Sequence, residues 1–278
     1  MRFDLADDAI PLLTTKRVFW KTATREMLWF LTGGTNIREL VRQKVHIWTD
    51  WPLDKFRKET GEQIDRETFE QRIIEDEEFA KQWGDLGPVY GKQWVDWPRY
   101  TPTGEGLFRR EEKGINQIAA LIDGIKTNPG SRRHIFTGWN VAELDQMALP
   151  PCHKTYQFYV SEGKLSGLLY QRSCDLGLGF AFNVFSAALL IRMIAQQCDL
   201  EPGEHMQRFH LSVDHRMIAD PAAHHQVTAQ QGRKHLKCSL LGRFVQLPLC
   251  KSHRLGGFDL RPPLQRRKVA VLQQAHHI

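Results

Sequence analysis

In this chain of 278 residues, the side chain that most directly suggests chemistry is a cysteine between a proline and a histidine. Cys152 follows Pro150 and Pro151 and precedes His153. The prolines restrict the backbone, so the thiol is presented in a defined direction. A thiol attacks as the thiolate, which nearby cations stabilise. A buried structural cysteine fits the same local sequence, so this pattern alone leaves both interpretations open.

Two groups of hydrogen-bond donors could hold an anionic substrate. Arg132 and Arg133 follow the turn sequence at 129–131, and adjacent arginines can clamp a phosphate through paired N–H groups. The run Gln171-Arg172-Ser173 adds donors at the end of an expected strand. A solvated surface pair is the alternative for the two arginines.

Two further polar residues could recognise the edge of a heterocycle. An amide donates and accepts together, so Asn183 can pair with a ring, and Asp175 can accept from one. A helix cap at Asn183 and an Asx turn at Asp175 are the structural alternatives.

The elements that must position these residues alternate between helix and strand. Apolar spacing predicts helices over 22–31, 37–43 and 115–126, and a long apolar helix over 183–198 that we expect to be buried on most sides. Strands are predicted over 134–139, over the hairpin 155–160 and 164–171, and, as a strand or turn, over 8–13. The highly charged stretch 54–82 is expected to be a solvated helical insertion. Together these elements predict an α+β fold with a mixed β-sheet flanked by helices.

Charge is distributed unevenly along the chain. Residues 205–278 hold 12 Lys and Arg against 3 Asp and Glu, whereas the rest of the chain holds 26 against 29. The same segment holds 9 of the 12 His and no Trp, Tyr or Glu. A basic patch invites a nucleic-acid interpretation. The histidines show no metal-ligand spacing, so no metal is expected.

Several classes of protein are disfavoured by composition. The sequence has no apolar stretch of about 18 residues, so no membrane span is expected. Its start, at residues 1–4, lacks a signal-peptide pattern. The five cysteines form no CxxC pair, which favours reduced thiols in the cytoplasm.

The conjunction of these motifs resembles thymidylate synthase over residues 2–204. The insertion at 54–82 resembles the longer small-domain insertion of some bacterial members. The matching strings, in order, are WFL at 29–31, GDLGPVYGKQW at 84–94, SRR at 131–133, WN at 139–140, MALPPCH at 147–153, QFYV at 157–160 and LYQRSCD at 169–175.

The resemblance implies a reaction. Cys152 would add to carbon 6 of the uracil of dUMP, and the resulting enolate would take a methylene group from 5,10-methylenetetrahydrofolate. The folate would also supply a hydride, which gives dTMP and dihydrofolate. Glu26, Tyr90 and His153 would organise the water network that moves protons at the ring.

The resemblance also implies how both ligands are held. Arg132 and Arg133 would reach the phosphate bound by the partner subunit, which implies a homodimer. The other residues expected to bind dUMP are Gln171, Arg172, Ser173, Cys174, Asp175 and Asn183. The residues expected to line the folate site are Ile47, Trp48, Leu149, Asp175, Gly179 and Phe182.

Two departures from the family are expected to matter. The chain begins where the family has an internal Met-Arg-Phe, so an earlier phosphate-binding arginine is missing. From residue 205 on, the family's His-x-Tyr ribose element and apolar C-terminal cap are not found, and Ser212 stands at the tyrosine position. We therefore expect a catalytic domain at 1–204, followed by an aberrant basic tail at 205–278 and impaired turnover.

A shifted reading frame is our hypothesis for this tail. A family-like Gly-Tyr-Asn read out of register can give Leu-Gln-Gln, as at 272–274. A newly evolved basic tail is the alternative.

Two other functions stay open at this point. One is a pyrimidine nucleotide hydroxymethylase of the same superfamily, although Asn183 favours uracil, since a cytosine enzyme is expected to have an acidic residue there. The other is a non-catalytic protein that holds a nucleotide, or that binds RNA through the basic tail in a salt-dependent way.

Overall fold

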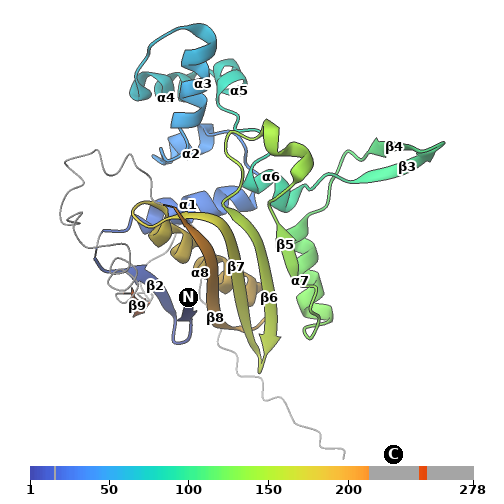
Figure 1. Ribbon diagram of the computed structural model, residues 1–278. Coiled ribbons are helices and arrows are strands. Elements are labelled where there is room, and N and C mark those ends of the chain that lie inside the picture. The colour runs from blue at the N-terminus through green and yellow to red at the C-terminus, as the bar shows by residue number, and fades with distance from the viewer. Residues whose placement is uncertain (16, 213–243, 249–278) are drawn as a thin grey trace, which may run out of the picture.

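A five-stranded mixed sheet forms the centre of the protein (Figure 1). The computed structural model describes residues 1–15, 17–212 and 244–248. The strand order is β1-β8-β7-β6-β5, and the neighbours are antiparallel except for β7 and β8, which are parallel. The strands are β1 (Arg2–Asp4), β5 (Ile135–Thr137), β6 (His153–Ser161), β7 (Lys164–Asp175) and β8 (Glu201–Ser212). The predicted α+β fold and the predicted hairpin are confirmed.

The long helix α8 (Gly179–Gln197) connects the parallel strands β7 and β8 and packs against the sheet. Twelve of its 19 residues are buried. The strand approaches the helix so closely at Gly167 that a Cβ there would lie 2.7 Å from Ile191 Cγ1. Within the part of the chain that the structure describes, α8 alone is long and apolar enough to cross a membrane, but 67% of its apolar window is buried in the protein. The predicted buried helix is therefore confirmed as the core helix of the fold.

Three helices complete this core: α1 (Trp20–Leu31), α6 (Tyr90–Val95) and α7 (Gln117–Thr127). Helix α1 carries Phe30, whose ring packs 4.7 Å from Tyr90 and 5.5 Å from Trp94 of α6. Helix α7 begins after Asn116, because that side chain accepts a hydrogen bond from the Ala119 N–H at 2.9 Å. The sequence predicted α1 and α7 but not the short helix α6.

The charged insertion is helical, as expected, but it also has a core of its own. It belongs to a helical lobe formed by α2 (Arg38–Arg42), α3 (Asp50–Thr60), α4 (Arg66–Glu75) and α5 (Glu77–Trp83). Phe56, Phe69 and Phe79 are buried there, with ring centroids 5.4 to 5.6 Å apart. The charged residues are thus the outer surface of an aromatic cluster.

Two strand pairs lie outside the central sheet. Strand β2 (Ala9–Leu13) pairs with β9 (Phe244–Pro248), which confirms the strand predicted near residue 8. Strands β3 (Tyr100–Gly104) and β4 (Leu107–Arg110) form a hairpin that projects from the body (Figure 1) and that the sequence analysis did not predict. A short 3-10 helix, η1, spans Val141–Gln146.

Strand β8 crosses residue 205, where the expected basic tail begins. His205 and Gln207 are buried at 0% and 3% exposure, although both are polar. Gln207 Oε1 accepts from His205 Nε2 at 3.0 Å, and Gln207 Nε2 donates to Gln171 Oε1. Gln171 Nε2 finds no partner among the described residues. Unsatisfied polar groups in the sheet are costly. The rest of the expected tail, 213–243 and 249–278, lies outside the described residues.

The burial of His205 predicts how stability depends on pH. Burial lowers the pKa of His205 to about 4, whereas an unfolded histidine titrates near 6.5. Between these pH values the imidazole is protonated in the unfolded chain but not in the folded chain. The free energy of unfolding therefore falls as the pH drops through this window, by up to about 3 kcal/mol. The variant His205→Leu is expected to lose a smaller share of its unfolding free energy between pH 7.5 and pH 5. Urea unfolding at the two pH values measures this, and an equal loss in both proteins would contradict it.

Candidate active site

Cys152 lies in the turn that enters β6, where the backbone is held from two sides. Its N–H donates to Tyr90 Oη of α6 at 2.6 Å. Its carbonyl oxygen accepts from the Arg172 N–H of β7 at 3.1 Å. The thiol is half-buried, and the other free cysteines of the described chain, Cys174 and Cys198, are buried. Among the three cysteines that the structure describes, Cys152 is therefore the accessible one, and its position is fixed.

Arg172 lies directly beside this cysteine. Its Nε donates to the Pro151 carbonyl at 3.1 Å and its Nη2 to the Pro150 carbonyl at 2.6 Å. The guanidinium also lies 5.8 Å from the centre of the Trp139 ring. One arginine thus fixes the two prolines and brings a positive charge to the turn that carries the thiol.

Three proton-carrying groups gather around the same turn. The Glu26 carboxylate accepts from Trp48 Nε1 at 2.7 Å. It is partly accessible but closely surrounded by protein, and this desolvation raises its pKa from 4.5 to about 7. Burial, followed by the nearby charge of Cys152, raises the pKa of Tyr90 well above its ordinary value. Burial lowers the pKa of His153 to about 4, so its ring is neutral at physiological pH.

Asn183, in the first turns of α8, joins two of the predicted site residues. Its side chain is hydrogen-bonded to His153 and to Cys174. Burial raises the pKa of the Cys174 thiol to about 12, so it stays protonated at neutral pH. Among these two neighbouring cysteines, Cys152 is therefore the candidate nucleophile.

Asp175 closes β7 and leads into α8. Its Oδ1 accepts from the Leu178 N–H at 2.6 Å, which fixes the turn before the helix. Ser173 and Asp175 are both partly accessible. The structure thus brings Ser173, Cys174 and Asp175 to the same end of the sheet as Cys152.

Gln171 does not join the donors beside Cys152. Its side chain is fully buried, and its Oε1 accepts from Gln207 Nε2 of β8. Neighbouring residues of a strand point to opposite faces, so Gln171 and Arg172 face apart. A phosphate held by Arg172 would therefore not meet this amide in the described arrangement.

Arg132 and Arg133 lie far from Cys152 within one chain. Both are exposed, in the loop that precedes β5. Because Ile135 pairs with Gln157 of β6, Arg133 lies near the far end of β6. At about 3.3 Å per residue, that end is roughly 20 Å from Cys152. The two arginines therefore cannot reach a ligand bound at Cys152 of their own chain without a large rearrangement.

The residues expected to line a folate site lie on two sides of the cysteine turn. Ile47 is 41% exposed, next to the buried Trp48. Leu149 is partly accessible three residues before Cys152, and Gly179 and Phe182 are partly accessible at the start of α8.

Sequence analysis missed two residues that contact the site. Tyr156 is buried, and its Oη lies 3.1 Å from His153 Nδ1. Trp139 lies beside Arg172. Strict strand alternation would place His153 and Tyr156, three residues apart, on opposite faces, and the register shift between His153 and Thr155 brings both inside. The Trp139 contact joins positions 33 apart and left no local signal. No group of three potential metal ligands occurs among the described residues.

The sheet, the core helix and the cysteine turn define an α+β protein with the groups that thiol-based nucleophilic catalysis requires. The chain belongs to the thymidylate synthase family: the sequence profile described as Thymidylate synthase matches residues 1–238.

Proteins named thymidylate synthase are close in sequence. That of Rhizorhabdus wittichii is 72% identical over 204 residues, which cover 73% of this chain and 66% of that protein. That of Novosphingobium aromaticivorans is 69% identical over 204 residues, which cover 73% of this chain and 65% of that protein. That of Sphingopyxis alaskensis is 74% identical over 201 residues, which cover 72% of this chain and 65% of that protein. The chain thus spans slightly less than two thirds of the length of these relatives.

Proposed function

We propose that the chain converts dUMP to dTMP by reductive methylation, with 5,10-methylenetetrahydrofolate as the donor of both the methylene group and the hydride. The observation that carries this proposal is the turn at Cys152, held between Tyr90 and Arg172 and surrounded by Glu26 and His153. The relatives named above carry the name of this activity. The free thiols fit a reducing compartment, and we place the reaction in the cytoplasm.

The reaction needs a thiolate and a stabilised enolate. The Cys152 thiolate adds to carbon 6 of the uracil, and the electron pair moves to carbon 5 and the carbonyl oxygen. Asn183, which His153 and Cys174 already orient, offers an amide to the polar edge of the ring. Carbon 5 then bonds to the methylene carbon of the folate, as one of the two carbon–nitrogen bonds of that carbon breaks and its electron pair goes to the nitrogen.

Proton transfer follows at carbon 5. Loss of that proton expels the folate amine and leaves an exocyclic methylene, which accepts a hydride from the folate as the Cys152 thiolate departs. Glu26 suits this exchange, because a group whose pKa is about 7 both donates and accepts near neutral pH. Tyr90 keeps its proton because its pKa is raised, and its oxygen already accepts the Cys152 N–H.

Arg172 and Ser173 would hold the phosphate, with Arg132 and Arg133 donated by a second subunit. A homodimer is supported by one face of the sheet, which no described helix or strand covers (Figure 1). Ile135, Tyr159 and Tyr170 are 47%, 51% and 43% exposed. Ile135 is in register with Gln157, and Gln157 with Leu168 of the next strand, so one row crosses this face. A second copy packed there would bury apolar area.

The predicted division at residue 204 is retained as a proposal, together with impaired turnover. Its support is the polar pair His205 and Gln207 inside the sheet. The match to the Rhizorhabdus wittichii protein covers 204 residues of this chain, whereas the family profile extends to residue 238.

Covalent trapping tests the proposed site apart from turnover. The purified protein is incubated with 5-fluoro-dUMP and methylenetetrahydrofolate, and intact mass spectrometry is expected to show an adduct at Cys152. Tritium release from labelled dUMP then measures turnover. An adduct with little release would support a formed site with impaired turnover. Absence of both would contradict the proposed function and favour a binding protein.

Replacement of Arg172 is expected to weaken nucleotide binding. The variant Arg172→Gln loses the charge and two hydrogen bonds to the proline carbonyls. Charge-assisted hydrogen bonds contribute about 1.5–3 kcal/mol each, so the KM for dUMP should rise by about 10- to 100-fold. The variant Arg172→Lys keeps the charge but not the paired donors, so its KM for dUMP should lie between those of the wild type and Arg172→Gln. Steady-state kinetics measures this, and an unchanged KM in Arg172→Gln would exclude a phosphate contact.

A further inference from the structure

One buried carboxylate takes no part in the chemistry described above. Glu70, in α4, is 8% exposed and is the sole Asp or Glu among the buried polar residues of the described chain. A buried carboxylate is costly unless it is hydrogen-bonded. Thr49 Oγ1 donates to Glu70 Oε1 at 2.5 Å, and His46 Nδ1 lies 2.7 Å from Glu70 Oε2. Both oxygens of Glu70 are therefore used to hold the segment 46–49.

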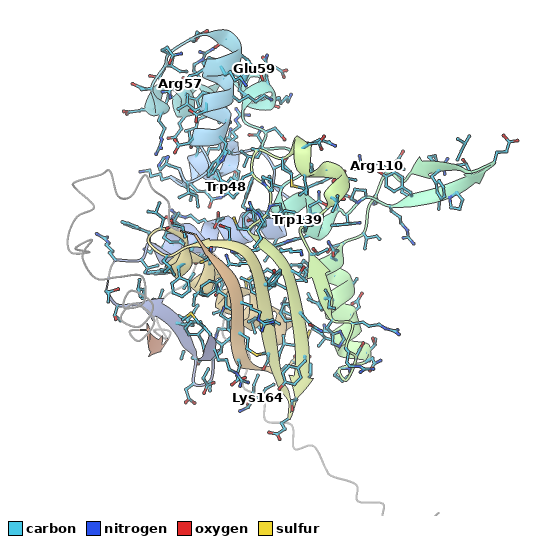
Figure 2. All side chains as sticks on the ribbon, in the orientation of Figure 1. Trp48, Arg57, Glu59, Arg110, Trp139 and Lys164 are labelled. Carbon is cyan, nitrogen blue, oxygen red and sulfur yellow. The ribbon has the colours of Figure 1, made fainter. Side chains whose placement is uncertain are left out.

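The residues between these two anchors reach the active site. Trp48 is 6% exposed, and its Nε1 donates to Glu26 Oε1 at 2.7 Å. Its ring centroid lies 6.1 Å from that of Tyr90. Figure 2 shows Trp48 where the helical lobe meets the body that contains α1. The ends of the segment are thus held by the lobe, while its middle contacts a proton-carrying group.

The helix that carries Glu70 is fixed independently of the site. Arg38 of α2 donates from Nη2 to the Ile74 carbonyl of α4 at 2.9 Å. Phe69 and Ile73, on the same helix, are fully buried. Asp65 caps its first turn by accepting from the Thr68 N–H at 2.7 Å. Glu70 therefore projects from a rigid support.

We propose that Glu70 is a positioning residue, through which the helical lobe holds segment 46–49 and fixes the hydrogen bond from Trp48 to Glu26. The proposal rests on the proposed function for its kinetic consequence, but the contact itself can be observed without turnover. The Trp48 hydrogen bond lowers the pKa of Glu26, against the larger effect of burial. A displaced Trp48 would therefore leave Glu26 with a still higher pKa. Ile47, expected to face the folate, would shift as well.

The indole N–H signal of Trp48 provides a direct test. Protein carrying ¹⁵N-indole tryptophan is titrated with pH and followed by NMR, and the signal that disappears in Trp48→Phe is assigned to Trp48. It should follow the ionisation of Glu26 near pH 7 and lose that dependence in Glu26→Gln. Tyr90 and Tyr156, the titratable groups whose pKa the charge of Glu26 raises, stay protonated over this range because burial raises both pKa values further.

Four variants separate positioning from a general loss of stability. Glu70→Leu removes both acceptors and should shift the Trp48 signal and raise its titration midpoint. Glu67→Leu makes the same change at an exposed position of α4 and should leave the signal unchanged. Glu70→Gln keeps an acceptor for Thr49 and should resemble the wild type. Thr49→Val removes the donor of the same hydrogen bond, so its effect on the Trp48 signal and that of Glu70→Leu should not add.

Kinetics gives the second measurement. Glu70→Leu should lower kcat/KM for the folate on the order of 10-fold, with the KM for dUMP changed by less than about 2-fold, since small displacements of site groups cost rate. A folded Glu70→Leu protein with a wild-type Trp48 signal and titration would overturn the proposal, even if its stability were lower. If that variant does not fold, Thr49→Val provides the same comparison. A wild type that gives neither the 5-fluoro-dUMP adduct nor turnover would refute the proposed function, while the Trp48 signal would still decide the role of Glu70.

Discussion

Replacement of Cys152 by serine is expected to abolish methyl transfer, with kcat lowered by about 10⁴-fold or more. The hydroxyl of serine is a far weaker nucleophile than a thiolate at neutral pH. The fold should be unaffected, because the turn is held by backbone groups: the Cys152 N–H on Tyr90 and the Cys152 carbonyl on Arg172. The variant should therefore still bind dUMP while it forms no adduct with 5-fluoro-dUMP.

A matched change elsewhere separates the nucleophile from a general effect of losing a thiol. Cys198 ends α8, where its Sγ donates to the Ile122 carbonyl at 3.9 Å. A serine there keeps a donor, so Cys198→Ser should trap the nucleotide as the wild type does. Calorimetry with dUMP, adduct mass and tritium release would be measured on all three proteins. An adduct in Cys152→Ser would place the reactive thiol elsewhere.

Replacement of Glu26 by glutamine is expected to stabilise the fold and to remove activity. The pKa of Glu26 is raised to about 7 from an ordinary 4.5, so the unfolded chain loses this proton more readily than the folded chain. Stability therefore falls as the pH rises from 4.5 through 7, and the ionised group costs about 2–3 kcal/mol above that window. Glutamine removes this cost and can still accept from Trp48. Turnover should fall by about 10²- to 10⁴-fold, because proton transfer at carbon 5 is lost.

Urea unfolding at pH 5 and at pH 8 measures the first part of this prediction. The gain in unfolding free energy of Glu26→Gln over the wild type should be small at pH 5 and large at pH 8. Tritium release at both pH values measures the second part. A gain independent of pH would show that ionisation of Glu26 does not limit stability, and normal turnover would remove Glu26 from the proton-transfer path.

Local patterns in the sequence predicted most of the core. The apolar run at 183–198 became α8, and the alternating segments on either side of Glu162-Gly163 became the β6–β7 hairpin. These elements are encoded by residues close together in the chain, so periodicity and turn residues were enough. The short sequences around Cys152 that resemble the thymidylate synthase family, taken in their order along the chain, also indicated the family. The family profile confirmed it.

Elements that depend on distant partners were not predicted. Strand β8 pairs in parallel with β7, and the helix α8 separates the two strands in the sequence. The buried side chains of β8 include the polar His205 and Gln207, so the strand lacks the apolar alternation that would have predicted it. The helices of the charged insertion were expected to be solvated, yet three phenylalanines from α3, α4 and α5 meet in their centre. Such a cluster exists only after the helices have packed.

The sequence by itself determined which residue types stand at the site: a thiol, an arginine, a carboxylate, a phenol and an imidazole. Only the tertiary structure decided their states. The pKa of Glu26 depends on burial and on Trp48, 22 residues away, and Gln171 is turned from Arg172 toward Gln207, 36 residues away. Desolvation and long-range hydrogen bonds arise from how segments pack, and no window of sequence contains both partners. The same holds for Glu70, whose link to Glu26 runs through two segments of the folded chain.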